Sequence, residues 1–437
     1  MHIFRERELS FMLKHGAAKV MIAPARFRGF DFEAMVTGLQ PALPSLRQLV
    51  IVGGAGPNSF DALLSGPAWE DAPDAAAILS HSRPGPDDIT QLIYTSGTTG
   101  EPKGVMHSAN TTMANIVPYA QRLGLGADDV VLMASPMAHQ TGFMYGLMMP
   151  IMLGASAVLQ DIWDPKQAIA AINAERASFT MASTPFLSDL AKTVAETGTE
   201  VPSLEVFLCA GAPIPGALVE QARRALGAKI VSAWGMSENG AVTLTRLDDD
   251  DERSIQTDGC PLPGVEIQVV DVDGRRLPAG EVGRLLLRAC SNFGGYLKRP
   301  QLNGTDADDW FDTGDLARID ERGYVRIAGR TKDVIIRGGE NIPVVEIESL
   351  LYRHPSIAMA AIVAYPDERL GERACAVVVP RPGCQVDLPS ISDFLKAQKV
   401  ALQYIPERLV LRETMPSTPS GNCLLYTSPS PRDQRGS

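Results

Sequence analysis

Residues 94–104 read Tyr94-Thr95-Ser96-Gly97-Thr98-Thr99-Gly100-Glu101-Pro102-Lys103-Gly104, directly after the apolar pair Leu92-Ile93. Glycine lets the backbone approach a ligand closely, and Ser and Thr hydroxyls donate hydrogen bonds to anionic oxygens. Lys103 adds a mobile positive charge. The stretch is therefore predicted to be a loop that follows a strand and holds phosphate groups.

The loop does not follow the P-loop pattern, because Lys103 lies after a proline and is followed by Gly104 without a strong helix start. A Ser/Thr/Gly-rich surface turn is the simpler explanation of such a composition. The combination of a preceding strand, three glycines, four Ser and Thr hydroxyls and the final Pro-Lys-Gly favours a nucleotide site. The candidates for nucleotide binding in this loop are Thr95, Ser96, Gly97, Thr98, Thr99, Gly100 and Lys103.

The same string resembles the signature loop of the adenylate-forming superfamily, which contains acyl-CoA synthetases, luciferases and the adenylation domains of peptide synthetases. The resemblance extends from about Arg5 to Gly421, with the strong motifs in the family's order. It implies an AMP-binding domain over residues 1–330, with a β-rich subdomain at about 260–330, and a small mobile α+β lid domain over 331–421. The short apolar run at 18–23 is consistent with a buried strand. Together with a second apolar strand at 46–54 and the helical stretches between them, it independently predicts layered α/β structure with a parallel sheet.

Composition narrows the classes of protein. The formal net charge of -11 over 437 residues argues against a nucleic-acid binder, which needs a basic face. Six widely separated cysteines without C-x-x-C spacing argue against a disulfide framework or a zinc site, and favour the reducing cytoplasm. The most apolar region, 142–159, is interrupted by Gly and Pro and is predicted to form a buried helix and strand rather than a transmembrane span.

Both ends of the chain depart from the family pattern. Members of the superfamily carry a substantial segment before the first strand seen here, so we expect this chain to be truncated at its N-terminus. Residues 422–437 abandon the pattern, and their Ser, Pro and Arg content predicts a disordered tail that is not native to the family.

A histidine in an apolar frame follows the strand predicted at 130–134. By its residues alone, His139 fits a core or capping histidine. The resemblance instead places His139 beside the acyl pocket, with Phe143, Phe186 and Met236 as further lining candidates. No fixed positive charge nearby would pair with a second carboxylate, so medium-chain aliphatic or alicyclic acids rank first and aryl acids second. The stretches 135–164, 209–215 and 335–342 look most like medium-chain fatty acyl and cyclohexanecarboxylate CoA ligases.

Two further strands are predicted before residues 183 and 211, and each is followed by a turn that contains small residues. Ligands of open α/β sheets bind outside the carboxyl ends of the strands, and small residues leave room for a flat ring. The resemblance assigns Ala210, Gly211, Ala212 and Pro213 to the wall around adenine. An ordinary strand-to-helix turn would explain the glycine and prolines equally well.

The stretch Trp234-Gly235-Met236-Ser237-Glu238 resembles the family's aromatic-Gly-x-Thr/Ser-Glu motif. The resemblance implies that the aromatic ring stacks near adenine, that Ser237 reaches the α-phosphate, and that Glu238 binds magnesium carried by ATP. Mg²⁺ commonly takes one or two protein carboxylates together with phosphate oxygens and water. A lone glutamate is more often surface charge, and the acidic run 248–252 is predicted to be a solvated loop rather than a metal site.

Three elements near the predicted domain boundary complete the resemblance. Asp315 resembles the aspartate that accepts hydrogen bonds from both ribose hydroxyls, a role that suits a carboxylate, although a local cap would also explain it. Arg330 matches an arginine that touches ribose or phosphate, and Lys332 matches the hinge of the small domain. A plain charged β-turn is the alternative here. Gly338 and Gly339 correspond to the loop that lines the pantetheine tunnel.

The family closes with Pro-x-Thr-x-Ser-Gly-Lys, and the segment ending at Gly421 reproduces all of it except the lysine, which is replaced by Asn422. In the family that lysine bridges the attacking carboxylate and the α-phosphate. Asparagine keeps a donor but loses the charge, so the first half-reaction is predicted to be impaired. The catalytic candidates are Lys103, His139, Glu238 and the altered position Asn422.

Together the motifs imply an acyl-CoA synthetase that uses ATP, Mg²⁺ and CoA and acts through an acyl-AMP intermediate. Its expected partners are a small carboxylic acid, ATP and CoA, with no nucleic acid. Two alternatives remain open: an amino-acid adenylation module, and an AMP-binding protein without turnover.

Overall fold

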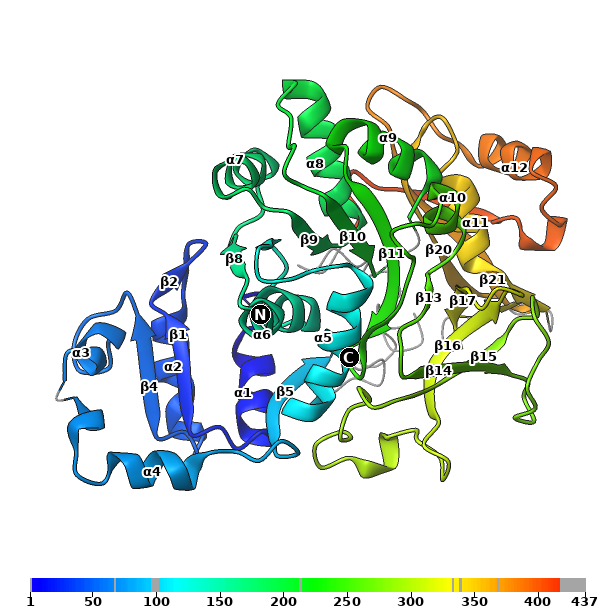
Figure 1. The fold of residues 1–437 in the computed structure, drawn as a ribbon. Coiled ribbons are helices and arrows are strands. Elements are labelled where there is room, and N and C mark those ends of the chain that lie inside the picture. The colour runs from blue at the N-terminus through cyan, green and yellow to red at the C-terminus, as the bar shows by residue number, and fades with distance from the viewer. Residues whose placement is uncertain are drawn as a thin grey trace. The chain divides into compact units, whose positions relative to one another are not determined.

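The computed structural model describes residues 2–66, 68–95, 102–211, 214–331, 334–337, 340–367 and 369–416. The chain divides into two compact units. The N-terminal unit comprises Met1–Thr111 and Phe293–Leu302, and the main unit comprises Thr112–Asn292 and Asn303–Ser437. Each unit is described separately (Figure 1).

The N-terminal unit contains short helices and three pairs of strands. The helices are α1 (Glu6–His15), α2 (Phe32–Leu39), α3 (Phe60–Leu64) and α4 (Ala75–Ser82), with 3₁₀ turns η1 (Gln40–Ala42), η2 (Trp69–Asp71) and η4 (Pro300–Leu302). The strand pairs are β1 (Val20–Pro24) with β4 (Gln48–Val52), β2 (Arg26–Phe27) with β3 (Phe30–Asp31), and β5 (Ile89–Thr95) with β6 (Lys103–Ser108). The β1–β4 pair is parallel, as the sequence predicts for these two strands.

Burial of the first strand differs from the prediction. Ala23 is buried against α2, but Val20 and Ile22 are 54% and 60% exposed. Among the described residues β1 pairs only with β4, and successive side chains of a strand point to opposite faces. One face therefore packs on α2 while the other stays open, so the prediction of a buried strand was wrong for half of its side chains.

A seven-stranded sheet forms the centre of the main unit. Its order is β13-β12-β11-β10-β9-β7-β8. The strands are β7 (Val130–Met133), β8 (Ser156–Leu159), β9 (Phe179–Ala182), β10 (Val206–Ala210), β11 (Lys229–Met236), β12 (Gly240–Leu244) and β13 (Cys260–Pro261). Strands β11, β10, β9, β7 and β8 run parallel, whereas β12 and β13 are antiparallel additions. The predicted parallel sheet is confirmed.

Helices cover both faces of this sheet (Figure 1). One face packs against α7 (Pro165–Glu175), α8 (Thr184–Thr197) and α9 (Gly216–Leu226). The other packs against α5 (Ala109–Arg122), the π-helix η3 (Thr141–Met148) and α6 (Met149–Leu153). Neighbouring strand residues divide between the two cores, with Leu132 in the first and Met133 in the second. The predicted helix and strand over 142–159 exist, but Leu159 is exposed because β8 is an edge strand.

A four-stranded antiparallel sheet follows, in the order β14-β15-β16-β17. Its strands are β14 (Val265–Val270), β15 (Gly283–Ala289), β16 (Phe311–Ile319) and β17 (Val325–Arg330). A turn at Asp273-Gly274 lies between β14 and β15, with Gly274 at φ +82°, a conformation that glycine adopts without strain. The strands expected in this region are therefore confirmed.

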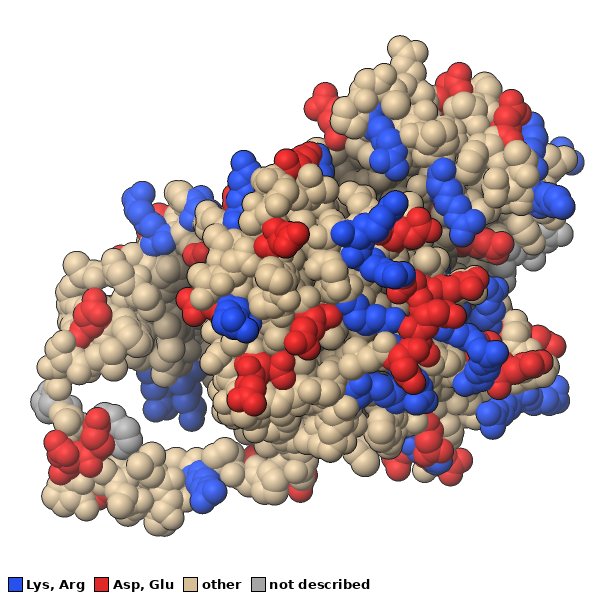
Figure 2. Space-filling view, turned by 45° about the horizontal axis from the view of Figure 1, so that its top comes forward, with Lys and Arg blue, Asp and Glu red and all other residues tan. Residues whose placement is uncertain are grey.

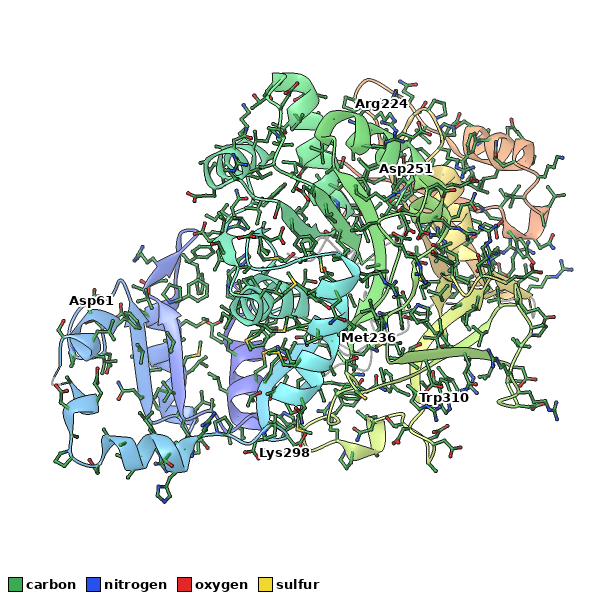
Figure 3. The ribbon with its side chains drawn as sticks, in the orientation of Figure 1. Asp61, Arg224, Met236, Asp251, Lys298 and Trp310 are labelled. Carbon is green, nitrogen blue, oxygen red and sulfur yellow. The ribbon has the colours of Figure 1, made fainter. Side chains whose placement is uncertain are left out.

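The acidic run at 248–252 leads from a turn into a helix. Residues 248–250 precede the helix and are exposed or half-buried, as predicted for a solvated loop, whereas Asp251 and Glu252 belong to the helix. Asp250 caps α10 (Asp251–Gln256), accepting from the backbone N–H of Arg253 at 3.0 Å. Asp251 pairs with Arg223 at 2.5 Å, and Figure 3 labels it at the start of the helix. Carboxylates are favoured at a helix N-terminus, where backbone N–H groups lack partners within the helix.

The C-terminal part combines a small sheet with two helices. Its strands are β18 (Ile335–Arg337), β19 (Glu340–Ile342), β20 (Ile357–Asp367), β21 (Gly371–Pro380) and β22 (Arg408–Leu411), and its helices are α11 (Val344–Leu351), α12 (Leu388–Ala397) and the 3₁₀ turn η5 (Leu402–Tyr404). One core joins both helices to the sheet. Asp387 caps helix α12 by accepting from the backbone N–H of Ser390. The predicted fold class, a large α/β part followed by a smaller α+β part, is confirmed.

The surface carries both signs of charge. On the face drawn in Figure 2, Lys and Arg side chains alternate with Asp and Glu over most of the area. Within the described ranges, no helix combines the length and the apolar character needed to cross a bilayer.

Candidate active site

The predicted phosphate loop connects the two strands of a hairpin in the N-terminal unit. Strand β5 ends at Thr95 and β6 begins at Lys103, and these two residues pair in register. A strand, not a helix, follows the loop, as expected for a loop other than a P-loop. The Thr95 hydroxyl is buried without a hydrogen-bond partner among the described residues, and Lys103 Nζ lies 2.9 Å from the hydroxyl of Tyr296.

Two parallel strands of the main unit end beside each other. Ala210, the last residue of β10, pairs with Ala233 of β11, next to Trp234. Gly211 follows with φ +95°, which glycine tolerates best. The structure therefore brings two of the predicted adenine-wall residues next to the Trp-Gly-Met-Ser-Glu motif.

The motif itself forms the end of the β11–β12 hairpin (Figure 3, Met236). Met236 pairs with Gly240, and the backbone N–H of Met236 donates to Oδ1 of Asn239 at 3.2 Å. A Cβ on Gly235 would lie 2.0 Å from the carbonyl oxygen of Gly240, so only glycine fits there. Residues 236–240, which we call the Glu238 turn, connect β11 to β12 and include Ser237 and Glu238, and Glu238 is buried.

A second buried carboxylate belongs to Asp315 on β16. Its Oδ2 accepts from Trp234 Nε1 at 2.9 Å, and its Oδ1 lies 3.2 Å from Nε of Arg330 on the neighbouring β17. The Asp315 side chain is 5% exposed and that of Arg330 is 58% exposed. Burial raises the pKa of Asp315, while the Arg330 charge and the Trp234 hydrogen bond oppose the rise.

Trp234 makes a contact that the sequence did not predict. Its ring is buried and packs with Val242, Leu285 and Leu287, and its N–H is used on Asp315. Sequence analysis missed this link, because 81 residues separate the partners. The available signal was the choice of Trp, which carries a donor that most buried Trp side chains satisfy. Stacking of this ring on adenine stays a prediction.

His139 lies between β7 and η3. The backbone N–H of Thr141 donates to its Nδ1 at 3.2 Å. Burial lowers the pKa of His139. A neutral ring that accepts at Nδ1 carries its proton on Nε2, so His139 offers an N–H donor on the other side of the ring.

The other predicted lining residues belong to different cores. Phe143 packs with the α5 and η3 face of the central sheet. Phe186 belongs to the core on the opposite face, where its ring lies 4.7 Å from that of Trp163. Met236 packs against the four-stranded sheet. The structure does not gather these three side chains into one cluster, and their contact with substrate stays a prediction.

Several predicted site residues lie outside the described residues, namely Ser96, Gly97, Thr98, Thr99, Gly100, Ala212, Pro213, Lys332, Gly338, Gly339 and Asn422. The described neighbours of the glycine pair are β18 and β19, which form an antiparallel hairpin. The tail predicted over 422–437 also lies outside them.

The described donors fit a magnesium ion that arrives with its nucleotide. No group of three or more His, Cys, Asp or Glu side chains within the described ranges could hold a metal ion by itself. Glu238 offers one buried carboxylate. Mg²⁺ that is already bound to phosphate oxygens requires only one or two such ligands.

Comparison with known families gives two matches along the chain. Residues 2–297 match the family of AMP-binding enzymes, and residues 346–422 match the AMP-binding enzyme C-terminal domain. The matched segments include the motifs at 94–104, 206–215 and 231–239.

Individual relatives agree with these matches. The chain is 37% identical over 421 residues to the medium-chain fatty-acid-CoA ligase of Escherichia coli (strain K12), covering 96% of this chain and 74% of that protein. It is 33% identical over 428 residues to the 2-hydroxy-7-methoxy-5-methyl-1-naphthoate-CoA ligase of Streptomyces carzinostaticus, covering 96% and 76%. The solved structure of the anthranilate CoA ligase AuaEII in complex with anthranoyl-AMP superposes with a TM-score of 0.84 at 25% identity, covering 97% of this chain and 80% of that chain.

Proposed function

The chain belongs to the family of AMP-binding enzymes, and on this premise we propose that it is an ATP-dependent acyl-CoA ligase for an apolar carboxylic acid. The observation that carries the proposal is the buried Asp315 carboxylate, held between Trp234 and Arg330. Trp234 also begins the motif that contains Glu238, so strand β11 both donates a hydrogen bond to Asp315 and leads into the turn that carries Glu238. Such an arrangement suits a ligand with a ribose and a metal-bound phosphate.

Asp315 is proposed to bind the ribose. Each of its oxygens already accepts one protein donor and retains a further lone pair for a ribose hydroxyl. Arg330, with its exposed side chain, can reach ribose or phosphate without leaving Asp315. In the N-terminal unit, the Thr95 hydroxyl, which has no hydrogen-bond partner among the described residues, is proposed to contact phosphate oxygens, as is the Lys103 ammonium.

In the proposed first half-reaction, a carboxylate oxygen of the acid attacks the α-phosphorus of ATP. The bond from that phosphorus to its bridging oxygen breaks, and pyrophosphate leaves with the electron pair. Magnesium held by Glu238 would offset negative charge on the leaving pyrophosphate. His139, neutral with its proton on Nε2, is proposed to donate a hydrogen bond within the acid site.

In the proposed second half-reaction, the CoA thiol attacks the acyl carbonyl carbon, loses its proton and expels AMP. The domain division at about residue 330 is part of this proposal, with Lys332 as the hinge and Gly338 and Gly339 along the pantetheine tunnel. Because Asn422 takes the place of the family's lysine, we propose that this chain is impaired in forming acyl-AMP but retains thioester formation.

The proposed acid is a medium-chain fatty or alicyclic acid, with aryl acids second. The relative in Escherichia coli carries a medium-chain name, whereas the Streptomyces relative is named for an aryl acid. The pocket candidates Phe143, Phe186 and Met236 are apolar, which favours an uncharged chain or ring. The cytoplasm is the proposed compartment, supported by the free thiols of Cys209, Cys260, Cys290, Cys375 and Cys384.

Octanoate-dependent exchange of pyrophosphate into ATP tests the first half-reaction, and thioester formation from octanoyl-AMP and CoA tests the second. We expect little exchange from the unmodified chain, clear thioester formation from supplied octanoyl-AMP, and exchange restored by Asn422→Lys. Full exchange without the substitution would contradict the impairment. AMP binding with neither half-reaction, in both proteins, would instead support an AMP-binding protein without turnover.

A further inference from the structure

Two buried polar side chains, on helices that cover one face of the sheet, form hydrogen bonds to the backbone at the Glu238 turn. Nδ2 of Asn115, on α5, donates to the carbonyl oxygens of Asn239 at 3.2 Å and Ala241 at 2.8 Å. The hydroxyl of Tyr145, on η3, accepts from the backbone N–H of Ala241 at 2.7 Å and donates to Oδ1 of Asn115 at 2.6 Å. Both backbone groups of Ala241 are therefore bound by side chains.

These bonds give partners to backbone groups that the hairpin ladder itself leaves unpaired. The register between β11 and β12 shifts at Trp234 and Gly235, beside the turn. A register shift leaves backbone groups without ladder partners, and buried backbone groups need partners. The fit is close, because a Cβ on Gly240 would lie 2.7 Å from the Asn115 side chain. Asn115 and Tyr145 therefore determine where the turn sits.

Tyr145 also lies on the segment that the proposed acid site uses. The π-helix η3 begins two residues after His139 and contains Phe143. π-Helical turns occur frequently at functional sites. One hydroxyl thus joins the segment proposed to contact the acid to the turn that carries Glu238.

We propose that Asn115 and Tyr145 are positioning residues that hold the Glu238 turn in the geometry required to bind magnesium with ATP. The proposal rests on the function proposed above, in which Glu238 receives the magnesium. Neither side chain touches the metal. Their effect passes through the backbone of Asn239, which follows Glu238 directly, and of Ala241, two residues further on.

The chain offers a matched control. The ring of Tyr119 stacks on that of Tyr145 with centroids 4.2 Å apart, and both side chains are fully buried. The Tyr119 hydroxyl, however, donates to Sδ of Met181 at 3.3 Å. Tyr119→Phe and Tyr145→Phe each remove one buried hydroxyl from the same stack, but only the second removes a bond to the hairpin.

The test measures the dissociation constant of ATP by calorimetry, with saturating MgCl₂ and with EDTA. The ratio of the two constants is the magnesium-dependent gain. We expect Tyr145→Phe to lower this gain about tenfold, as for loss of a buried hydrogen bond, and Tyr119→Phe to leave it unchanged. Glu238→Gln should abolish the gain, and adding Tyr145→Phe to Glu238→Gln should cause no further loss, because both act on one interaction.

The outcomes separate the two proposals. A normal gain in folded Tyr145→Phe, together with a lost gain in Glu238→Gln, overturns the positioning role and leaves the proposed function intact. No gain in the unmodified protein overturns the magnesium role of Glu238 and the positioning role with it. If Tyr145→Phe does not fold by circular dichroism, Asn115→Ser replaces it, and a normal gain in that variant overturns the positioning role.

Discussion

The indole nitrogen of Trp234 lies 2.9 Å from Oδ2 of Asp315, although the two residues belong to different sheets of the main unit. The bond satisfies a buried donor and half of a buried carboxylate at once. Arg330 holds the other oxygen. Burying a charge is costly unless it is paired and hydrogen-bonded, so both donors are needed to keep Asp315 ionised and oriented.

Trp234→Phe keeps an apolar ring but removes the donor to Asp315. A hydrogen bond to a charged group contributes about 1.5–3 kcal/mol, so we expect AMP affinity to fall at least about tenfold and the free energy of unfolding to decrease. Calorimetric titration with AMP and urea unfolding measure both effects. The matched control is Trp310→Phe. The Trp310 ring contacts Arg288, which lies on the same sheet as Asp315. Equal AMP affinity in Trp234→Phe and the unmodified protein would contradict the role given to this bond.

His139 should make stability depend on pH. Burial lowers its pKa from 6.5 in the folded state, so the unfolded chain binds more protons in the window just below pH 6.5. The free energy of unfolding therefore rises with pH through that window, and the contribution of His139 to stability is lost as the pH falls through it. His139→Gln should show a shallower loss between about pH 7 and pH 5.

Urea unfolding at a series of pH values measures this difference. The control is His81→Gln, at an exposed histidine whose ring contacts its own helix. His2 and His354 also have lowered pKa values, but they are present in all three proteins and do not affect the comparison. Identical pH profiles for His139→Gln and the unmodified protein would show that the buried ring does not contribute.

Gly235→Ala should disrupt the hairpin that carries Glu238. The added Cβ would lie 2.0 Å from the Gly240 carbonyl oxygen and 2.5 Å from the Ala241 Cα, and backbone atoms cannot move aside cheaply. We expect a loss of about 3 kcal/mol in the free energy of unfolding, the upper end of the usual cost of overpacking. Gly126→Ala is the control, because no atom lies within 4 Å of its added Cβ. A loss in Gly235→Ala no larger than in the control would refute the packing argument.

Lys103→Met should weaken ATP binding more than AMP binding, if the ammonium contacts the outer phosphates. The substitution keeps a long apolar stem beside the Tyr296 ring, whose centroid lies 4.1 Å from Nζ, and removes the charge together with its N–H donors. We expect about tenfold weaker ATP binding and nearly unchanged AMP binding. Lys298→Met, which removes a lysine bonded to the His15 carbonyl in the same unit, serves as the control. Equal weakening for both nucleotides would place Lys103 away from the outer phosphates.

Much of the fold follows from local sequence pattern. Short apolar strands and helical stretches predicted the parallel sheet, and the family resemblance implied the β-rich stretch and the small α+β part; all three are present. Errors arose where burial depends on neighbours. β1 is half exposed because its described partner is β4 alone. The last two residues of the acidic run belong to a helix because Asp250 accepts from the backbone N–H of Arg253.

The motif residues were identifiable from their order and spacing, because the groups that form a phosphate loop or a hairpin turn lie on consecutive residues. Which side chains meet was decided by the tertiary structure. Trp234 reaches Asp315 across 81 residues, and Asn115 reaches Ala241 across 126. Phe143 and Phe186 are both apolar, yet they occupy opposite faces of one sheet. Alternation along a strand and the path of the chain between strands set these contacts, and neither is visible in any single motif.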